Sequence, residues 1–145
     1  TRNKNIKIYL FEPLPENISR LKTNLQGFES RYELHEVAVG LENGHADFGF
    51  EATGRYGGLK SNLPETIQVQ VRKVEEIISS ILEKEDHIDI LKIDVEGYES
   101  KILSHLSLGV ISCVDRIYAE TKDPPNLQGF AAKRYGGLTR YFRKK

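Results

Sequence analysis

Apolar residues along the chain follow two periodicities, one typical of strands and one typical of helices. Four short segments rich in β-branched and aromatic residues are predicted to be strands, at residues 6–11, 32–39, 88–95 and 114–120. Between them, apolar residues recur every three or four positions, which predicts amphipathic helices opening at Pro13 and Pro15, over 74–82 and after Gly97. Strands that alternate with helices in this way are typical of an α/β domain with a mostly parallel, doubly wound sheet.

Two further segments, 46–51 and 67–72, alternate apolar and polar residues with a period of two. They flank a stretch rich in glycine and proline, 52–65, which is predicted to be a loop. We expect these two strands to form a small antiparallel insertion within a single domain spanning 1–145. The segment 88–95 is apolar on both faces near its centre, which predicts a strand inside the sheet with helices on both sides.

Charge and composition exclude several classes of protein. The chain has 21 basic and 21 acidic residues among its 145, so the excess of basic charge that marks nucleic-acid-binding proteins is missing. No apolar run is long enough to cross a bilayer and no signal-peptide pattern opens the sequence, so we expect a soluble, cytoplasmic protein with no membrane partner. The basic residues from Arg140 onward are expected to form a solvated terminus. The four histidines are dispersed, and their spacing predicts no metal site.

Acidic residues stand at the ends of three predicted strands. Glu12 follows the first strand, Asp94 and Glu96 lie at the end of the segment 88–95, and Glu120 ends the segment 114–120. In open α/β sheets, ligands bind outside the carboxyl ends of parallel strands, so these acids predict a polar ligand site. A carboxylate in the position of Glu12 can accept hydrogen bonds from ribose hydroxyls, both in dehydrogenases and in methyltransferases.

Two residues near this predicted site carry more specific expectations. Lys92 is a cation in an otherwise apolar strand, and we predict that it pairs with one of the strand-end acids. Glu99 shares a helix face with Leu103 and Leu106, so its side chain is expected to point toward the sheet rather than toward bulk water.

Three stretches of the sequence resemble the FkbM-type methyltransferases, which depend on S-adenosylmethionine (SAM). Residues 9–17 (YLFEPLPEN) are similar to the family's second strand and following helix. Residues 37–40 (VAVG), with Asn43-Gly44 after them, resemble its third strand and turn. Residues 91–99 (LKIDVEGYE) resemble the hallmark "lKiDvEGaE", the most specific of the three.

The resemblance implies a Rossmann-like fold, SAM as cofactor, and methyl transfer to a hydroxyl of a saccharide or natural product. It further implies that Glu12 binds the ribose of SAM and that Ala38 and Val39 lie beside the adenine. Asp94 would face the methyl donor, and Glu96 would orient the acceptor or take its proton.

Members of the family begin with a strand that ends in an acidic, glycine-rich loop, whereas this sequence starts at Thr1, just before the second strand. We therefore expect a fold that is incomplete at its N-terminus, weak SAM binding, and exposed sheet edges through which a homodimer could form. Three alternatives stay open. They are a non-catalytic remnant or binding module without the SAM loop, a nicotinamide-dependent dehydrogenase using Glu12, and a divalent-metal site formed by Asp94, Glu96 and Glu120.

Overall fold

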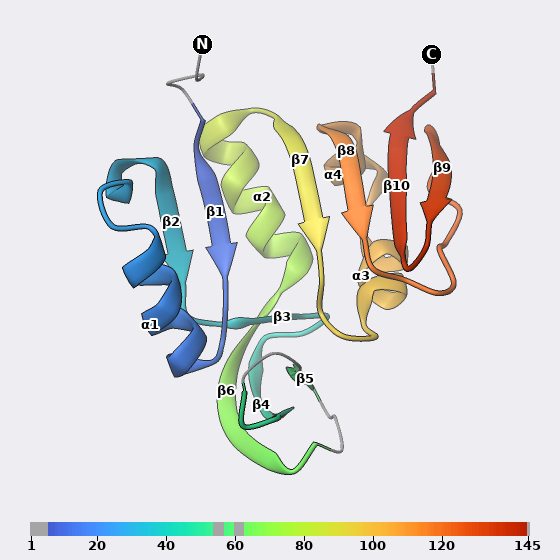
Figure 1. Ribbon diagram of the computed structural model, residues 1–145. Coiled ribbons are helices and arrows are strands. Elements are labelled where there is room, and N and C mark those ends of the chain that lie inside the picture. The colour runs from blue at the N-terminus through green and yellow to red at the C-terminus, as the bar shows by residue number, and fades with distance from the viewer. Residues whose placement is uncertain (1–5, 54–56, 60–62, 145) are drawn as a thin grey trace. The chain divides into compact units, whose positions relative to one another are not determined.

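The computed structural model describes residues 6–53, 57–59 and 63–144, which form two compact units (Figure 1). The first unit holds the described residues up to Val39 together with those of Gly44–Val71, and the second holds Gly40–Asn43 and the chain from Arg72 onward. The longest described helix, α2 (Val74–Glu85), has 12 residues, and no described helix combines the length and apolar character of a membrane span.

The first unit opens with a strand–helix–strand element. β1 (Ile8–Phe11) and β2 (Tyr32–His35) pair in parallel, and α1 (Pro15–Asn24) with the short 3-10 helix η1 (Glu29–Arg31) connects them. The proline at the first position of α1 suits the helix start because its missing N–H would have no helical partner there. The predicted strand 32–39 is split, since β2 ends at His35 and β3 (Ala38–Gly40) belongs to another sheet.

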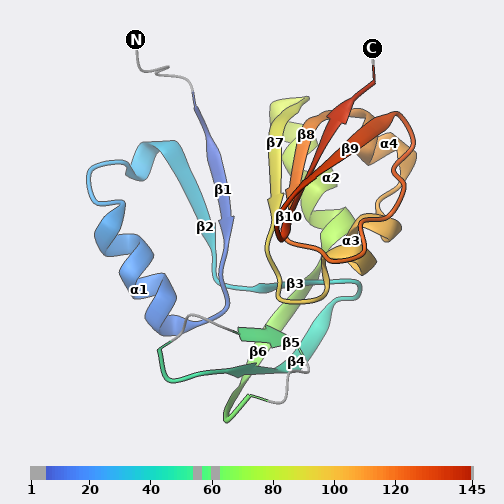
Figure 2. The same ribbon diagram turned by 45° about the vertical axis from the view of Figure 1, so that its right-hand side comes forward.

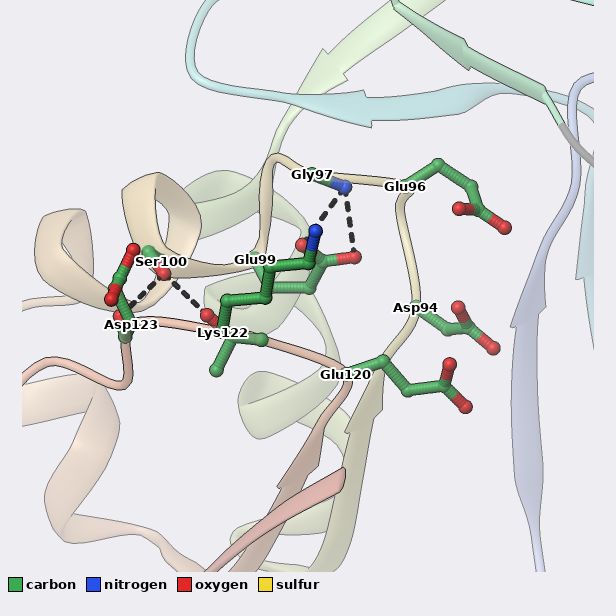
Figure 3. Close-up of a pocket in the computed structure, with 9 residues that line it drawn as sticks. Asp94, Glu96, Gly97, Glu99, Ser100, Glu120, Lys122 and Asp123 are labelled. Atoms are coloured by element: carbon green, nitrogen blue, oxygen red, sulfur yellow. Dashed lines mark hydrogen bonds between the residues drawn. The ribbon is translucent and has the colours of Figure 1, made fainter. Parts of the chain in front are cut away.

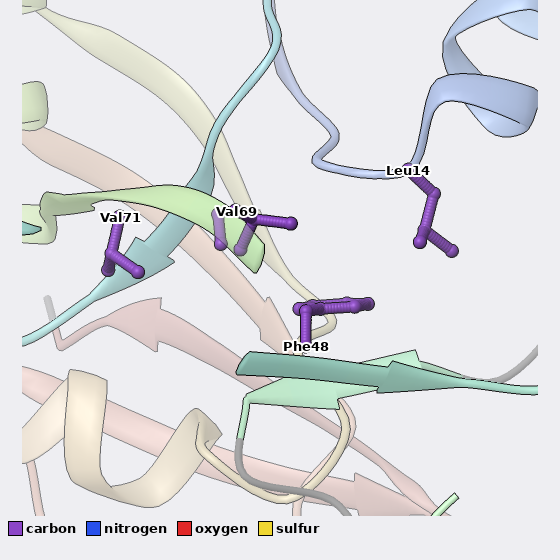
Figure 4. Packing of buried hydrophobic residues seen from close by; sticks show 5 residues of the cluster. Leu14, Phe48, Val69 and Val71 are labelled. Carbon is purple, nitrogen blue, oxygen red and sulfur yellow. The ribbon is translucent and has the colours of Figure 1, made fainter. Parts of the chain in front are cut away.

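That other sheet has the strand order β3–β6–β4–β5, with β4 (Gly44–Phe50), β5 (Gly57–Leu59) and β6 (Glu65–Lys73). β4 pairs antiparallel with both β5 and β6, as the period-two pattern predicted. The predicted loop 52–65 is interrupted by β5. A cluster of buried apolar side chains forms the core here (Figure 4): Leu14, Ala38, Phe48, Val69 and Val71.

The second unit contains a four-stranded sheet of order β7–β8–β10–β9, formed by β7 (Ile88–Ile93), β8 (Val114–Ala119), β9 (Phe130–Tyr135) and β10 (Leu138–Arg143). β7 and β8 are parallel, whereas β10 runs antiparallel to both of its neighbours. Three helices, α2, α3 (Glu99–His105) and α4 (Leu108–Ser112), lie on one face of this sheet (Figure 2). On that face Ile117, Thr139 and Tyr141 are fully buried.

The predicted fold class, a mostly parallel, doubly wound Rossmann-like sheet with a small antiparallel insertion, is wrong. The described strands form three separate sheets, and their antiparallel pairs outnumber the parallel pairs β1–β2 and β7–β8. The strands predicted as a small insertion belong to the four-stranded sheet β3–β6–β4–β5, which has its own core. The basic residues from Arg140 to Arg143, predicted to be a solvated terminus, lie in β10, between β8 and β9.

The interior position predicted for the segment 88–95 is also wrong. Within the described residues β7 has one hydrogen-bonded neighbour, β8, and is therefore an edge strand of its sheet. Because helices cover only one face, Ile93 is buried while Ile90 is 55% exposed. An open edge with an exposed apolar side chain is the kind of surface that favours association, so a homodimer through this edge stays a prediction.

Candidate functional site

A cavity of about 470 Å³ lies where β7 and β8 end (Figure 3). Ile93 and Ala119 are paired at the ends of these parallel strands, and the ladder continues because the Glu120 N–H donates to the Ile93 carbonyl at 3.3 Å. Asp94 and Glu120 therefore follow at the same level of the sheet. Every lining residue belongs to the second unit: Asp94, Glu96, Gly97, Glu99, Ser100, Glu120, Thr121, Lys122 and Asp123.

Lys92 pairs with Asp94, which confirms the prediction that this strand cation finds a strand-end acid. The Lys92 Nζ donates to Asp94 Oδ2 at 2.7 Å. Both side chains are on the same face of the chain because they are two residues apart in extended backbone. The hydrogen bond that Lys92 donates to Asp94 raises the pKa of Lys92 above its ordinary value, with a smaller contribution from the charge of Glu120. Lys92 thereby places a positive charge beside the acidic cavity.

Glu96 has an unusual backbone conformation for a residue that is not glycine. Its φ is 48°, in the left-handed region, which costs an L-residue about 1–2 kcal/mol. Its side chain points the same way as those of Asp94 and Glu120 (Figure 3). Loss of hydration on burial raises the pKa of Glu96, and the nearby charges of Asp94, Glu99 and Glu120 raise it further. A carboxylate with a raised pKa is a stronger base than an ordinary surface glutamate.

Glu99 is the first residue of α3 and is 3% exposed, which confirms that its side chain points inward. Its carboxylate accepts hydrogen bonds from two backbone amides that precede the helix. Oε1 accepts from the Val95 N–H at 3.0 Å, and the Gly97 N–H lies 3.0 Å from Oε2 and 3.2 Å from Oε1. The segment between β7 and α3 therefore folds around this one side chain.

Gly97 provides a direct test of this backbone geometry. Its φ is 92°, and a Cβ added there would meet no atom within 4 Å, so the constraint is conformational rather than steric crowding. We expect Gly97→Ala to destabilise the fold by about 1–2 kcal/mol in urea unfolding. The matched control is Gly109→Ala in α4, where helical backbone suits alanine and stability should stay the same or rise. Equal responses of the two variants would contradict the left-handed geometry at Gly97.

A chain of hydroxyl groups also lines the cavity and has no counterpart in the sequence predictions. Ser100 Oγ donates to the Asp123 carbonyl at 2.7 Å and lies 2.5 Å from Thr121 Oγ1. Because Ser100 has one hydroxyl proton and gives it to Asp123, Thr121 must be the donor between the two hydroxyls. Thr121 is 4% exposed. Nothing in the sequence marks this contact, because its two residues are 21 positions apart.

Comparison with protein families decides which chemistry this cavity belongs to. The sequence matches the family described as "Methyltransferase FkbM domain" over residues 1–141. The chain belongs to this family. Comparisons with curated proteins and with solved structures gave no significant match. Membership of a methyltransferase family favours a methyl donor such as SAM and gives no support to the nicotinamide-dependent dehydrogenase alternative.

The residues expected to bind the cofactor lie in the first unit of the FkbM domain. Glu12 follows β1, and its Oε1 accepts a hydrogen bond from the Leu14 N–H at 2.9 Å. Partial burial raises the pKa of Glu12, while hydrogen bonds from Leu14 and Asn17 act in the opposite direction. In β3 the Ala38 side chain is buried in the apolar core, whereas Val39 is half-buried. The roles of Glu12, Ala38 and Val39 toward the cofactor stay predictions.

The FkbM domain offers little support for a metal held by Asp94, Glu96 and Glu120. Within the described part of the chain, the only three ligand groups with atoms inside 4.8 Å of one another are His87, Asp89 and Asp115. These three are exposed and lie at the opposite ends of β7 and β8 from the cavity. His87 Nε2 is 3.2 Å from Asp115 Oδ2, so an exposed histidine–aspartate pair already accounts for much of their proximity.

Proposed function

We propose that this FkbM domain transfers a methyl group from SAM to a hydroxyl group of a saccharide or small natural product. The observation that carries the proposal is the gathering of Asp94, Glu96 and Glu120 at the ends of β7 and β8, with Glu96 in a strained backbone conformation. Strained residues persist where the surrounding structure holds them in place, and they are concentrated at functional sites.

The residues present suit the chemical groups of SAM. A half-buried carboxylate such as Glu12 keeps acceptor capacity for ribose hydroxyls beside its bond to Leu14, and Val39 offers apolar surface to a base. When bound, SAM supplies a methyl group already activated by its sulfonium. The task left to the protein is to hold the acceptor oxygen in line and to remove its proton.

In this proposal Glu96 accepts the proton of the acceptor hydroxyl, for which its raised pKa suits it. Asp94 faces the reacting groups, and the ammonium group of Lys92 keeps its carboxylate oriented at 2.7 Å. Ser100 and Thr121 belong to the cavity wall, where their hydroxyl network with the Asp123 carbonyl gives that wall a fixed shape.

The charge of the cavity limits the class of acceptor. Its lining includes the carboxylates of Asp94, Glu96, Glu120 and Asp123. The lining contains one lysine, Lys122, so negative charge is in excess. A neutral acceptor rich in hydroxyl groups can donate hydrogen bonds to these oxygens, whereas a uronate or phosphate would be repelled by them. We therefore propose neutral sugars or polyols as acceptors, in preference to anionic saccharides.

We expect SAM binding to depend on Glu12. Calorimetric titration of SAM into the purified protein should give a weak 1:1 complex, and Glu12→Ala should weaken it further by about 1–3 kcal/mol because hydrogen bonds to a charged group are lost. The control is Glu16→Ala, which removes an exposed glutamate in the first turn of α1 whose partner is Arg20 at 3.7 Å. Equal affinities of the two variants would contradict the role of Glu12, and absence of any SAM binding would contradict the cofactor assignment.

The acceptor class can be tested by incubating the protein with methyl-labelled SAM and matched neutral and uronate-containing oligosaccharides. Label should enter the neutral series. Transfer confined to the uronate series would contradict the proposed acceptor class, and transfer to amines but not hydroxyls would contradict oxygen as the acceptor atom.

A further inference from the structure

The buried carboxylate of Glu99 is held by backbone amides rather than by a cation. Only 3% of the residue is exposed, and within the described part of the chain no ion pair joins it to a lysine or arginine. Its partners are the amides of Val95 and Gly97, at 3.0–3.2 Å. Burying an anion is costly unless it is well hydrogen-bonded, so these contacts are needed for the side chain to stay inside the fold.

The two amides stand on either side of Glu96. β7 ends at Ile93, so the amides of Val95 and Gly97 lie beyond this strand. The Glu99 carboxylate is their hydrogen-bond acceptor. Hydrogen bonds to an ionised group are about twice as strong as those between neutral groups. Hydrogen bonds to Glu99 therefore fix the backbone directly before and directly after Glu96, whose φ is 48°.

Stabilisation of the helix does not account for this arrangement. An acid in the first turn of α3 interacts favourably with the helix dipole from any exposed position, without burial. An N-cap side chain would accept from amides inside the first turn, and a capping-box glutamate would accept from the amide of the N-cap residue, Tyr98. Glu99 instead accepts from Val95 and Gly97, which precede that residue. The contacts are those of a side chain that shapes the preceding loop.

We propose that Glu99 is a positioning residue: its carboxylate fixes the backbone on both sides of Glu96 and so holds the Glu96 side chain in the cavity. The catalytic consequence rests on the function proposed above, while the loop geometry does not. Glu99 is not a catalytic residue in this scheme because it acts through Glu96 rather than on the reacting atoms.

The experiment compares Glu99→Gln with Glu83→Gln, which neutralises an exposed glutamate of α2. Glutamine keeps the size of the side chain but removes its charge and replaces one acceptor oxygen by a donor. In amide hydrogen exchange followed by NMR, the Glu99 variant should exchange at least tenfold faster at Val95 and Gly97, with amides of β8 unchanged. Carbon-detected titration should show a lower pKa for Glu96, which in the native protein faces Asp94, Glu99 and Glu120. Glu83→Gln should change neither reading.

The kinetics of methyl transfer are the second measurement. For Glu99→Gln we expect kcat to fall at least tenfold while KM for SAM changes less than threefold, because the loop is displaced but the cofactor residues in the first unit are not altered. Loss of stability in urea without any change in amide exchange or in the Glu96 titration would overturn the proposal, since Glu99 would then act on the fold alone. Should Glu99→Ala fail to fold, the isosteric glutamine variant still decides the matter. A native protein without methyl transfer would contradict the proposed function, and amide exchange together with the Glu96 titration would then decide the inference independently.

Discussion

Replacing Glu96 by glutamine is expected to reduce methyl transfer by about 10²–10⁴-fold, the range in which a positioned general base contributes. Glutamine has nearly the same shape but cannot accept the proton of the acceptor hydroxyl. The left-handed backbone at this position is the same for both side chains, so urea unfolding should change little. Initial rates of label transfer from SAM at saturating acceptor measure the effect, with Glu83→Gln as the control.

The pH dependence of methyl transfer distinguishes loss of the Glu96 base from a change in the shape of the site. Burial and the neighbouring acids raise the pKa of Glu96, so the protonated and inactive form persists to a higher pH than for an ordinary glutamate. Native activity should therefore rise as pH increases through this raised pKa, and the residual activity of Glu96→Gln should lack that rise. A variant that keeps the native rate and pH profile would show that another group removes the proton.

Tyr141 is expected to contribute more to stability than any surface residue of its sheet. Its side chain is 1% exposed in β10, and its hydroxyl donates to the Pro125 carbonyl at 3.1 Å. Tyr141→Ala should lower the free energy of unfolding by about 3–5 kcal/mol, because a large buried ring is replaced by a cavity. The control Tyr135→Ala removes a ring that is 52% exposed and should cost much less in the same urea titration. Similar losses for the two would contradict the central position of β10.

The same residue gives a signature at alkaline pH. Burial raises the pKa of Tyr141 to about 12, whereas the unfolded chain has the ordinary value near 10. The neutral phenol is thus favoured by folding, and its contribution is complete below pH 10 and lost as pH rises toward 12. Two pKa units correspond to about 2–3 kcal/mol. Relative to the native protein, Tyr141→Phe should lose about 1 kcal/mol at neutral pH, from the hydrogen bond, and should be less sensitive to alkali. Parallel pH curves for the two proteins would contradict this.

The sequence by itself determined most of the local elements and the chemistry at the ends of β7 and β8. Period-two alternation identified β4 and β6, and apolar spacing identified α1 and α2, because these patterns depend on which side of an element meets the core. The pairing of Lys92 with Asp94 and the inward direction of Glu99 were also predictable, since both follow from residues two or four positions apart. The stretch from Leu91 to Glu99 identified the family for the same reason, because its motif is a run of consecutive residues.

Only the tertiary structure decided how the strands are assembled. Residues 138–143 were not predicted to be a strand, yet they form β10 between β8 and β9. Thr139 and Tyr141 face the helices, while Arg140 and Phe142 face the other way. The segment 88–95 predicted an interior strand, but burial depends on neighbours that periodicity does not specify, and β7 is an edge. The contacts that line the cavity are likewise not specified by periodicity. Ser100 is hydrogen-bonded to Thr121, and Glu99 accepts hydrogen bonds from the amides on either side of Glu96. These contacts exist only once the chain between β7 and β8 has folded.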